Sequence, residues 1–213
     1  MYLQKQFEES RVEIMRGLMR THPLATLITL SPSGLNADHI PLHLSENPLP
    51  FGTLRGHIAH ANPLWKDHSP DVEVLAVFHG PDTYITPSWY ATKKETGKVA
   101  PTWNYAVVHA YGHLRVIDDA VWLRSQLDIL TRQNEADFPE SWEVSDAPPE
   151  FVEKLLQNII GIEMVITRLI GKWKVSQNQP ASNQASVIKG LRESDQPDAG
   201  FMADLISKAG INN

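Results

Sequence analysis

TWNYAVVHAYGHLRVI, at residues 102–117, is the stretch that decides the fold. Apolar and polar residues alternate along it, which is typical of a β-strand with one buried face, so it predicts the longest strand of the chain. Upstream of it, VEVLAVF at residues 72–78 is a nearly continuous apolar run, as expected for a central strand covered on both faces. Four more strands are predicted, at residues 25–30, 36–44, 51–59 and 162–170, with a turn at residues 31–34.

Helices are predicted at the two ends of the chain and late in its sequence. About six strands with helices placed in this way predict a mainly β fold with peripheral helices (α+β), a small decorated barrel and not an alternating βαβ sheet. The helix that follows Pro149 is predicted to bury one face, made of Val152, Leu155, Leu156 and Ile159. The predicted helices lie between residue 7 and Pro23, after the N-cap candidates Asp118 and Asp119, from residues 145–149 onward, and near residues 186–192 and 199–209.

The composition is that of a folded globular protein. Of the 213 residues, 42% are hydrophobic and 21% are charged, which allows a substantial core in one domain, or in one domain with an appendage. The formal net charge of −6 argues against a broad basic face for nucleic acid. The acidic N-terminal segment is unlike a signal peptide, and no window has the about 20 apolar residues of a membrane span, so we expect a cytoplasmic protein without a membrane segment.

Several chemistries find no support in the residues. The chain has no cysteine, which excludes disulfides, iron–sulfur clusters and thiolate metal sites. Its nine histidines form no H-E-x-x-H motif, and no carboxylate stands at helpful spacing from them, so no metal site is predicted. A G-x-S-x-G elbow, a P-loop and a dinucleotide fingerprint are also missing, so no catalytic residue is assigned.

LRGHIAHANPLW, at residues 54–65, is the most informative local stretch. In a strand, Arg55 and His57 face the same way, and Asn62 with Pro63 would cap and open a helix. A helix start presents free N–H groups and the positive end of a dipole, and Arg55 adds a cation nearby, so the stretch is suited to a phosphate. The alternative is that Arg55 and His57 lie on a solvated strand face and that Asn62 only caps a helix.

Two aromatic clusters, at residues 84–90 and 101–105, flank a loop that carries Lys93, Lys94 and Lys98. Tryptophan and tyrosine are suited to stacking on a planar heterocycle, and hydrogen-bonding groups at Ser88, Thr102 and Asn104 are suited to orienting it. The alternative is that these aromatic residues belong to the core or to a dimer interface. Residues 171–178, GKWKVSQN, either close over a ligand or form an exposed strand end with solvated lysines.

Several blocks of the sequence together resemble the PaiB-type family, described as FMN-binding negative transcriptional regulators and as protease synthase and sporulation negative regulatory proteins. The resemblance runs from about residue 2 to residue 191 and implies a split-barrel fold like that of pyridoxine-phosphate oxidase. It also implies a homodimer with FMN near its interface. Because the chain turns polar beyond Gln179, we expect a barrel domain at residues 1–178 and a helical tail at residues 179–213. The blocks are LRGHIAHANPLW, VFHGPDTYITPSWY, VAPTWNYAVVHAYG, LTRQNE, VSDAPPEF and GKWKVSQNQP.

The resemblance also implies roles for individual residues. Superfamily oxidases often have arginine or lysine in the turn that here reads His60-Ala61-Asn62, so Lys93 or Lys98 is an alternative phosphate contact. Three groups of cofactor-binding residues follow from the resemblance: Arg55, His57, His60 and Asn62 for the phosphate and ribityl chain; Ser88, Trp89, Trp103 and Asn104 for the ring or its edge; and Lys174 and Gln177 as lid or partner-subunit residues.

Three functions remain open at this point. The resemblance implies a flavin-binding negative transcriptional regulator, but the sequence contains no helix-turn-helix and its charge gives direct DNA binding no support. The second function is a flavin-dependent oxidoreductase, in which FMN itself carries the hydride chemistry. The third is a dimer without flavin, whose pocket holds another phosphorylated small molecule.

Overall fold

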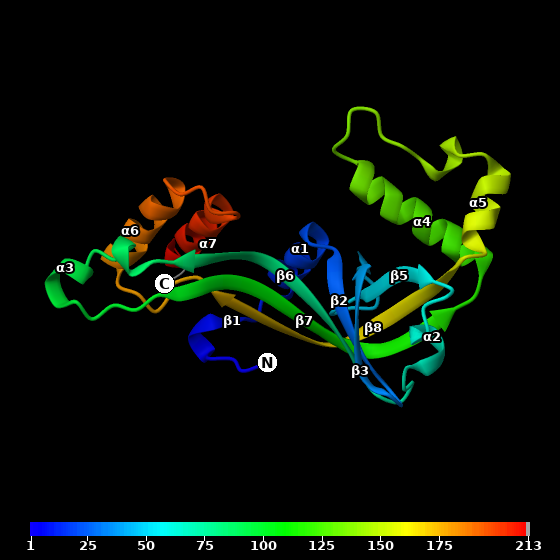
Figure 1. Cartoon of the computed structure of the whole chain (residues 1–213), viewed down its shortest axis with the longest axis horizontal. Coiled ribbons are helices and arrows are strands. Elements are labelled where there is room, and N and C mark those ends of the chain that lie inside the picture. The colour runs from blue at the N-terminus through cyan, green and yellow to red at the C-terminus, as the bar shows by residue number, and fades with distance from the viewer. Residues whose placement is uncertain (212–213) are drawn as a thin grey trace. The chain divides into compact units, whose positions relative to one another are not determined.

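The computed structural model describes residues 1–211, and side chains through residue 209. Over this range the strands form one eight-stranded sheet in the order β3-β2-β6-β7-β8-β5-β4, with β1 paired to β8 (Figure 1). The paired segments with a defined register are all antiparallel. The strands are β1 (Glu8–Glu9), β2 (Leu24–Ser31), β3 (Gly34–Pro41), β4 (His43–Ser45), β5 (Thr53–Ala59), β6 (Val74–Ile85), β7 (Thr102–Ile117) and β8 (Ile159–Lys174).

Helices lie in each of the predicted regions, but the N-terminal one begins at Val12, after strand β1, and Ile159, predicted on a helix face, belongs to β8. Asp119 caps the longest helix, since its side chain accepts a hydrogen bond from the backbone N–H of Trp122 at 2.7 Å. The helices are α1 (Val12–Thr21), α2 (Leu64–Asp67), α3 (Lys93–Thr96), α4 (Ala120–Glu135), α5 (Pro149–Leu156), α6 (Ala181–Arg192) and α7 (Ala199–Ile211), with 3₁₀ turns at Lys5–Phe7, Pro87–Trp89 and Val144–Asp146.

The described chain divides into two compact units. The first comprises residues 1–15, 79–108 and the chain from residue 170 onward, and the second comprises residues 16–78 and 109–169. Strands β6, β7 and β8 have residues in both units. The predicted division into a domain at 1–178 and a tail at 179–213 remains a prediction.

The second unit contains a sheet that closes on itself. β3 and β4 lie at opposite ends of the strand order, yet only Leu42 separates them in the chain. The sheet must therefore curl until its two ends meet, and the side chain of Leu42 is buried at that junction. The two ends approach so closely that a Cβ on Gly56 of β5 would lie 3.0 Å from the carbonyl oxygen of Pro41. A side chain at this position would displace the side chain of Leu42 and press on the carbonyl of Pro41, which favours glycine.

Two predicted strands differ from the observed ones. The stretch predicted at 36–44 is broken at Leu42 into β3 and β4, because the chain passes there from one end of the sheet to the other. Strand β6 continues seven residues past Phe78, through Pro81 to Ile85. The register of β6 with β2 covers only residues 75–77, so Pro81, which has no N–H, lies beyond the paired β2 segment.

Two predicted helices also differ. The helix expected after Asn62 is a single turn, although the backbone N–H of Leu64 does donate to Oδ1 of Asn62 at 2.9 Å. In α5, Val152 is buried as predicted, but 47% of Leu155 is exposed. The apolar face of this helix is therefore only partly covered by the rest of the described chain.

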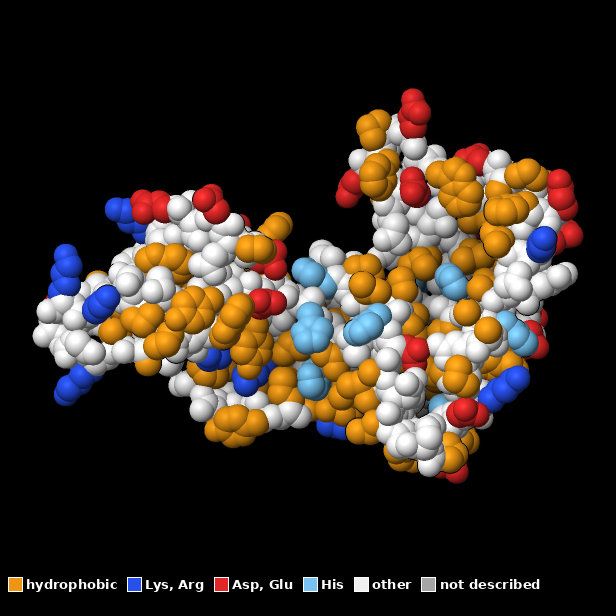
Figure 2. Space-filling model, viewed as in Figure 1, with side chains coloured by type: hydrophobic (Ala, Val, Ile, Leu, Met, Phe, Trp, Pro, Cys, Tyr) orange, Lys and Arg blue, Asp and Glu red, His pale blue; other side chains and the backbone are white. Residues whose placement is uncertain are grey.

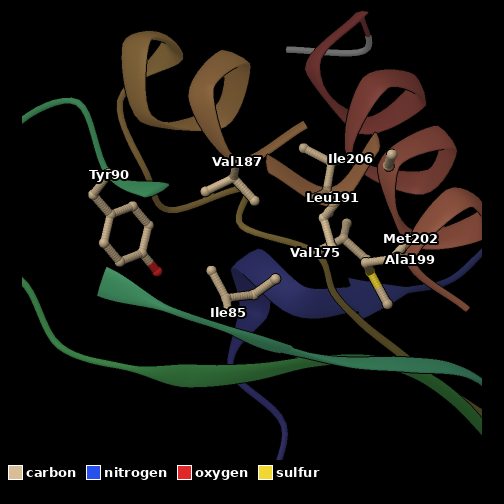
Figure 3. Close-up of a cluster of buried hydrophobic side chains, with 9 residues drawn as sticks. Ile85, Tyr90, Val175, Val187, Leu191, Ala199, Met202 and Ile206 are labelled. Carbon is tan, nitrogen blue, oxygen red and sulfur yellow. The ribbon is translucent and has the colours of Figure 1, made fainter. Parts of the chain in front are cut away.

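The first unit has its own hydrophobic core. Helices α6 and α7 pack their apolar faces against the end of β6 and the residues that follow β8 (Figure 3). Gly190 of α6 allows the close approach of Trp89, whose ring would lie 2.5 Å from a Cβ at that position. The core residues are Ile85, Tyr90, Val175, Val187, Leu191, Ala199, Met202, Ala203 and Ile206. Among the described residues, no helix combines the length and apolar character needed to cross a bilayer.

Close contact between strands β7 and β8 gives a prediction for stability. A Cβ at Gly112 would overlap the backbone oxygen of Val165 and lie 2.8 Å from Cγ of Met164. We expect Gly112→Ala to lower the free energy of unfolding by about 1–3 kcal/mol, since backbone must move. In the control Gly17→Ala, on helix α1, a Cβ meets nothing within 4 Å, and stability should rise by up to about 1 kcal/mol. Urea unfolding measures the free energy of unfolding of both variants, and equal changes in the two would contradict the prediction.

Candidate functional site

A polar cavity of about 270 Å³ lies in the first unit, where β7 begins and β8 ends. Two lysines, Lys98 and Lys174, are part of its wall, and none of its lining residues is acidic. The other lining groups are hydroxyls, amides, a phenol and small apolar side chains. The lining residues are Tyr90, Lys98, Val99, Ala100, Pro101, Thr102, Asn104, Lys174, Ser176, Asn178 and Gln179.

Local backbone geometry positions the polar wall of this cavity. Thr102 and Asn104 are two residues apart on β7 and therefore project from the same face of the strand. After β8 ends, Ser176 adopts a left-handed conformation with φ of 62°, which turns the chain sharply. Asn104, only 1% exposed, donates from Nδ2 to Oγ of Ser176 at 2.9 Å. This hydrogen bond ties the turn after β8 to the start of β7.

Lys174 is the cation with the most unusual environment. Its Nζ donates to the hydroxyl of Thr102 and, at 2.7 Å, to the carbonyl oxygen of Trp103. Burial lowers the pKa of Lys174; the nearby Tyr105 opposes this effect and Lys172 adds to it. No ion pair among the described residues neutralises this ammonium group. A partly buried charge without a counter-ion favours an anionic ligand, which would supply the missing partner.

The predicted ring-binding residues are distributed over the first unit. Asn104 lines the cavity, and Trp103 contributes its carbonyl to Lys174, while its indole is 54% exposed. The Trp103 and Tyr84 rings meet edge to face, with centroids 5.9 Å apart. Ser88 accepts a hydrogen bond from Nζ of Lys93 at 3.3 Å. None of Ser88, Trp89 and Lys93 is part of the cavity wall.

Gln177 has a structural role in the turn after β8. Its Oε1 accepts from the backbone N–H of Val175 at 2.7 Å, and its Nε2 donates to the carbonyl of Trp173. The side chain also lines a separate groove of about 740 Å³ between the N-terminal segment, residues 173–177 and α7. Of the two predicted lid residues, Lys174 therefore belongs to the cavity and Gln177 to this groove.

The four phosphate residues predicted in the stretch at 54–65 lie in the second unit, and two of them contact carboxylates. Nε of Arg55 pairs with Glu163 at 2.8 Å, and Arg115 approaches the same carboxylate at 3.7 Å. Nδ2 of Asn62 donates to Oδ1 of Asp38 at 2.8 Å. A phosphate at either position would meet a like charge, which lowers its affinity unless the carboxylate is displaced.

The two predicted histidines of this stretch also have partners. Nδ1 of His57 lies 3.0 Å from Oε1 of Gln126 on helix α4. The exposed ring of His60 lies against Trp65, with centroids 5.0 Å apart, and Trp65 donates from Nε1 to the His60 carbonyl. The phosphate roles of Arg55, His57, His60 and Asn62 remain predictions.

Tyr90, Ser176, Asn178 and Gln179 lie in stretches that the sequence singled out, but none of them was given an individual role. The polar run after β8 was the available signal, but the backbone turn at Ser176 cannot be deduced from residue types. Lys98, predicted as an alternative phosphate contact, does line the cavity. Over the described residues, no cluster of three or more histidine, aspartate or glutamate side chains is placed to hold a metal ion.

Comparison with known sequences shows related proteins over nearly the whole chain. Residues 1–168 match the family described as "Putative FMN-binding domain". An uncharacterised protein of Emericella nidulans is 38% identical over 99% of this chain and 98% of its own length. Protease synthase and sporulation protein PAI 2 of Bacillus subtilis is 29% identical, over 97% of this chain and 96% of its own length.

Solved structures share the fold. The flavocytochrome Anf3 of Azotobacter vinelandii superimposes with a TM-score of 0.62 at 13% identity, covering 81% of this chain and 72% of that protein. An FAD- and heme-binding protein of Mycobacterium smegmatis gives 0.57 at 16% identity, covering 78% and 73%. The predicted fold class, a mainly β split barrel with peripheral helices, is confirmed.

The environment of Lys174 predicts how anion binding depends on pH. Sulfate, which does not titrate near neutrality, should bind the cavity while Lys174 is protonated, and its affinity should fall as pH rises. Because the pKa of Lys174 lies below the ordinary value, the fall should begin at a lower pH than for an exposed lysine. Lys174→Arg should remove the early part of this fall, since arginine stays protonated. Calorimetric titration of both proteins over a pH series measures this, and identical pH profiles would contradict it.

Proposed function

The chain belongs to the FMN-binding domain family that its residues 1–168 match, and from this premise we propose an FMN-dependent regulatory protein whose cavity at Lys174 binds the flavin phosphate. FMN is the cofactor that the family assigns, which confirms the prediction from the sequence. The observation that carries the proposal is the partly buried ammonium group of Lys174 in a cavity with no acidic lining residue. A phosphate dianion supplies the counter-charge that this site lacks.

The groups around Lys174 fit the polar end of FMN. Lys174 and Lys98 are proposed to hold the phosphate by charge-assisted hydrogen bonds, and the hydroxyls of Thr102 and Ser176 are available to complete its coordination. Lys174 already donates to Thr102, so the ligand would join an ordered network. When bound, FMN supplies one- or two-electron redox chemistry, and the protein's contribution is to bind and orient it.

The cavity is too small for the whole cofactor. Sites for ligands of this size occupy about 300–1,000 Å³, whereas the cavity measures about 270 Å³. The isoalloxazine ring is therefore proposed to lie outside it, against the exposed indole of Trp103, with a second subunit covering its other face. This is why we propose a homodimer with the cofactor near its interface.

The regulatory part of the proposal is supported by one relative. The Bacillus subtilis protein, similar over 97% of this chain, is named for protease synthesis and sporulation, which are processes and not a reaction. The net charge of −6 makes a phosphate backbone an unfavourable partner, so we propose that the effect on transcription is indirect. The alternative function, an FMN-dependent oxidoreductase, requires only that a reductant reach the bound flavin.

The first test is the affinity for FMN. Lys174→Met should weaken FMN binding by about 10- to 100-fold, because one charge-assisted hydrogen bond to phosphate contributes about 1.5–3 kcal/mol. Riboflavin, which lacks the phosphate, should bind both proteins equally. Lys94→Met removes an exposed lysine of α3 that does not line the cavity and should leave FMN affinity unchanged. Quenching of flavin fluorescence on titration measures the affinities of the wild type and the two variants for these flavins.

The same measurement decides between the two candidate phosphate sites. If Arg55→Met weakens FMN but not riboflavin, while Lys174→Met has no such effect, the phosphate lies at the Arg55 stretch and the Lys174 assignment is wrong. If neither the wild type nor any of these variants takes up added FMN, the proposed flavin function itself is wrong.

Redox and DNA assays distinguish the functions. We expect the FMN-loaded protein to show no steady-state turnover with NADH or NADPH, and no promoter-specific gel shift at low salt. Sustained bleaching and reoxidation of the bound flavin would instead show an oxidoreductase. A specific shift with a steep salt dependence would show direct DNA binding, in spite of the acidic charge.

A further inference from the structure

The segment from the end of α4 through α5 exposes large apolar side chains. Phe138 is 62% exposed, Trp142 46%, Phe151 53% and Leu155 47%. Figure 2 shows hydrophobic side chains together with acidic ones over α4, α5 and the segment between them. We call these four side chains the α5 surface. Exposed aromatic residues that gather in one region generally mark a place where another molecule binds.

Helix α5 carries two apolar stripes, and the described chain covers only one of them. Val152 is 4% exposed and anchors the helix. Phe151 and Leu155 are four residues apart, so they lie on the same face one turn from each other, and about half of each is exposed. Such an i, i+4 pair offers a ridge against which another helix can pack.

The charges around the α5 surface are mainly acidic, although Lys154 lies on α5 beside Leu155, and Arg124 and Arg132 of α4 line a pocket together with Glu143. Residues 133–153 contain no lysine or arginine, and no ion pair of the described residues uses any of the carboxylates in this range. Glu143 and Asp146 are engaged in a capping box, and Glu135 accepts from the backbone N–H of Trp142. The acidic residues of the range are Glu135, Asp137, Glu140, Glu143, Asp146, Glu150 and Glu153.

We propose that the α5 surface binds a basic amphipathic helix of another protein. The apolar side of that helix would pack on Phe151, Leu155 and Trp142, and its lysines or arginines would pair with the surrounding carboxylates. Charge complementarity selects this occupant. A second copy of the same surface would bring seven carboxylates against seven more, and an anionic lipid surface or a nucleic acid would be repelled in the same way.

The proposal does not depend on FMN binding. Every residue of the α5 surface belongs to the second unit, whereas the cavity at Lys174 belongs to the first. A basic protein partner would nevertheless give an acidic chain a route to influence transcription without contacting DNA. Failure of one proposal leaves the other unaffected.

The test uses the full chain and a synthetic peptide of about five helical turns, built from lysine and leucine with leucines at i, i+3, i+4 spacing. We expect calorimetric titration to show binding that weakens as salt rises, and at least about tenfold weaker binding of a scrambled peptide of the same composition. Phe151→Ser should weaken binding by about tenfold or more. Phe201→Ser, which removes a 68% exposed phenylalanine from α7, should leave it unchanged.

A second variant tests the electrostatic part without altering the apolar ridge. The double substitution Glu150→Gln and Glu153→Gln should weaken binding of the amphipathic peptide and flatten its dependence on salt. Urea unfolding curves that match those of the wild type serve as the control for folding of these variants.

Three results would overturn the proposal. The first is equal binding of the scrambled and amphipathic peptides, and the second is equal binding by wild type, Phe151→Ser and the double glutamine variant. The third is self-association of the wild type, seen by sedimentation, that Phe151→Ser abolishes; this would assign the surface to a second copy of the chain.

Discussion

A single residue between two distant strands constrains the barrel. β3 and β4 stand at opposite ends of the strand order, and the chain passes from one to the other through Leu42. The sheet can satisfy this connection only by curling until its ends meet, which places Leu42 inside and leaves little room for a side chain at Gly56.

The strands of this closed sheet also build the candidate site. β7 and β8 are neighbours in the strand order, and both continue from the second unit into the first. Thr102 and Asn104 come from the beginning of β7, and Lys174 comes from the end of β8. Burial lowers the pKa of Lys174, and its ammonium group meets hydroxyl and carbonyl oxygens but no carboxylate, so its charge is available to an anion.

The charges of the chain are distributed unevenly between the cavity at Lys174 and the α5 surface. Lysines and no acids line the cavity proposed for the flavin phosphate, while acidic residues outnumber basic ones around the exposed aromatic side chains near α5. An isolated cation in a partly dry cavity and a solvated acidic surface select opposite ligands, a phosphorylated small molecule and a basic protein segment. The net charge of −6 for the whole chain therefore does not report the local charge of the cavity or of the α5 surface.

The sequence by itself indicated most of the strands, the helical regions, the fold class and the family, because these follow from local periodicity, capping residues and ordered blocks. The full span of β7 and the cap at Asp119 were readable in this way. Tertiary structure alone decided the break at Leu42, the extension of β6 past Pro81, the exposure of Leu155 and the partners that Arg55 and Asn62 find in Glu163 and Asp38. Hydrophobic spacing reports which side of an element is apolar; only the packing of distant segments determines what covers that side and which charges come together.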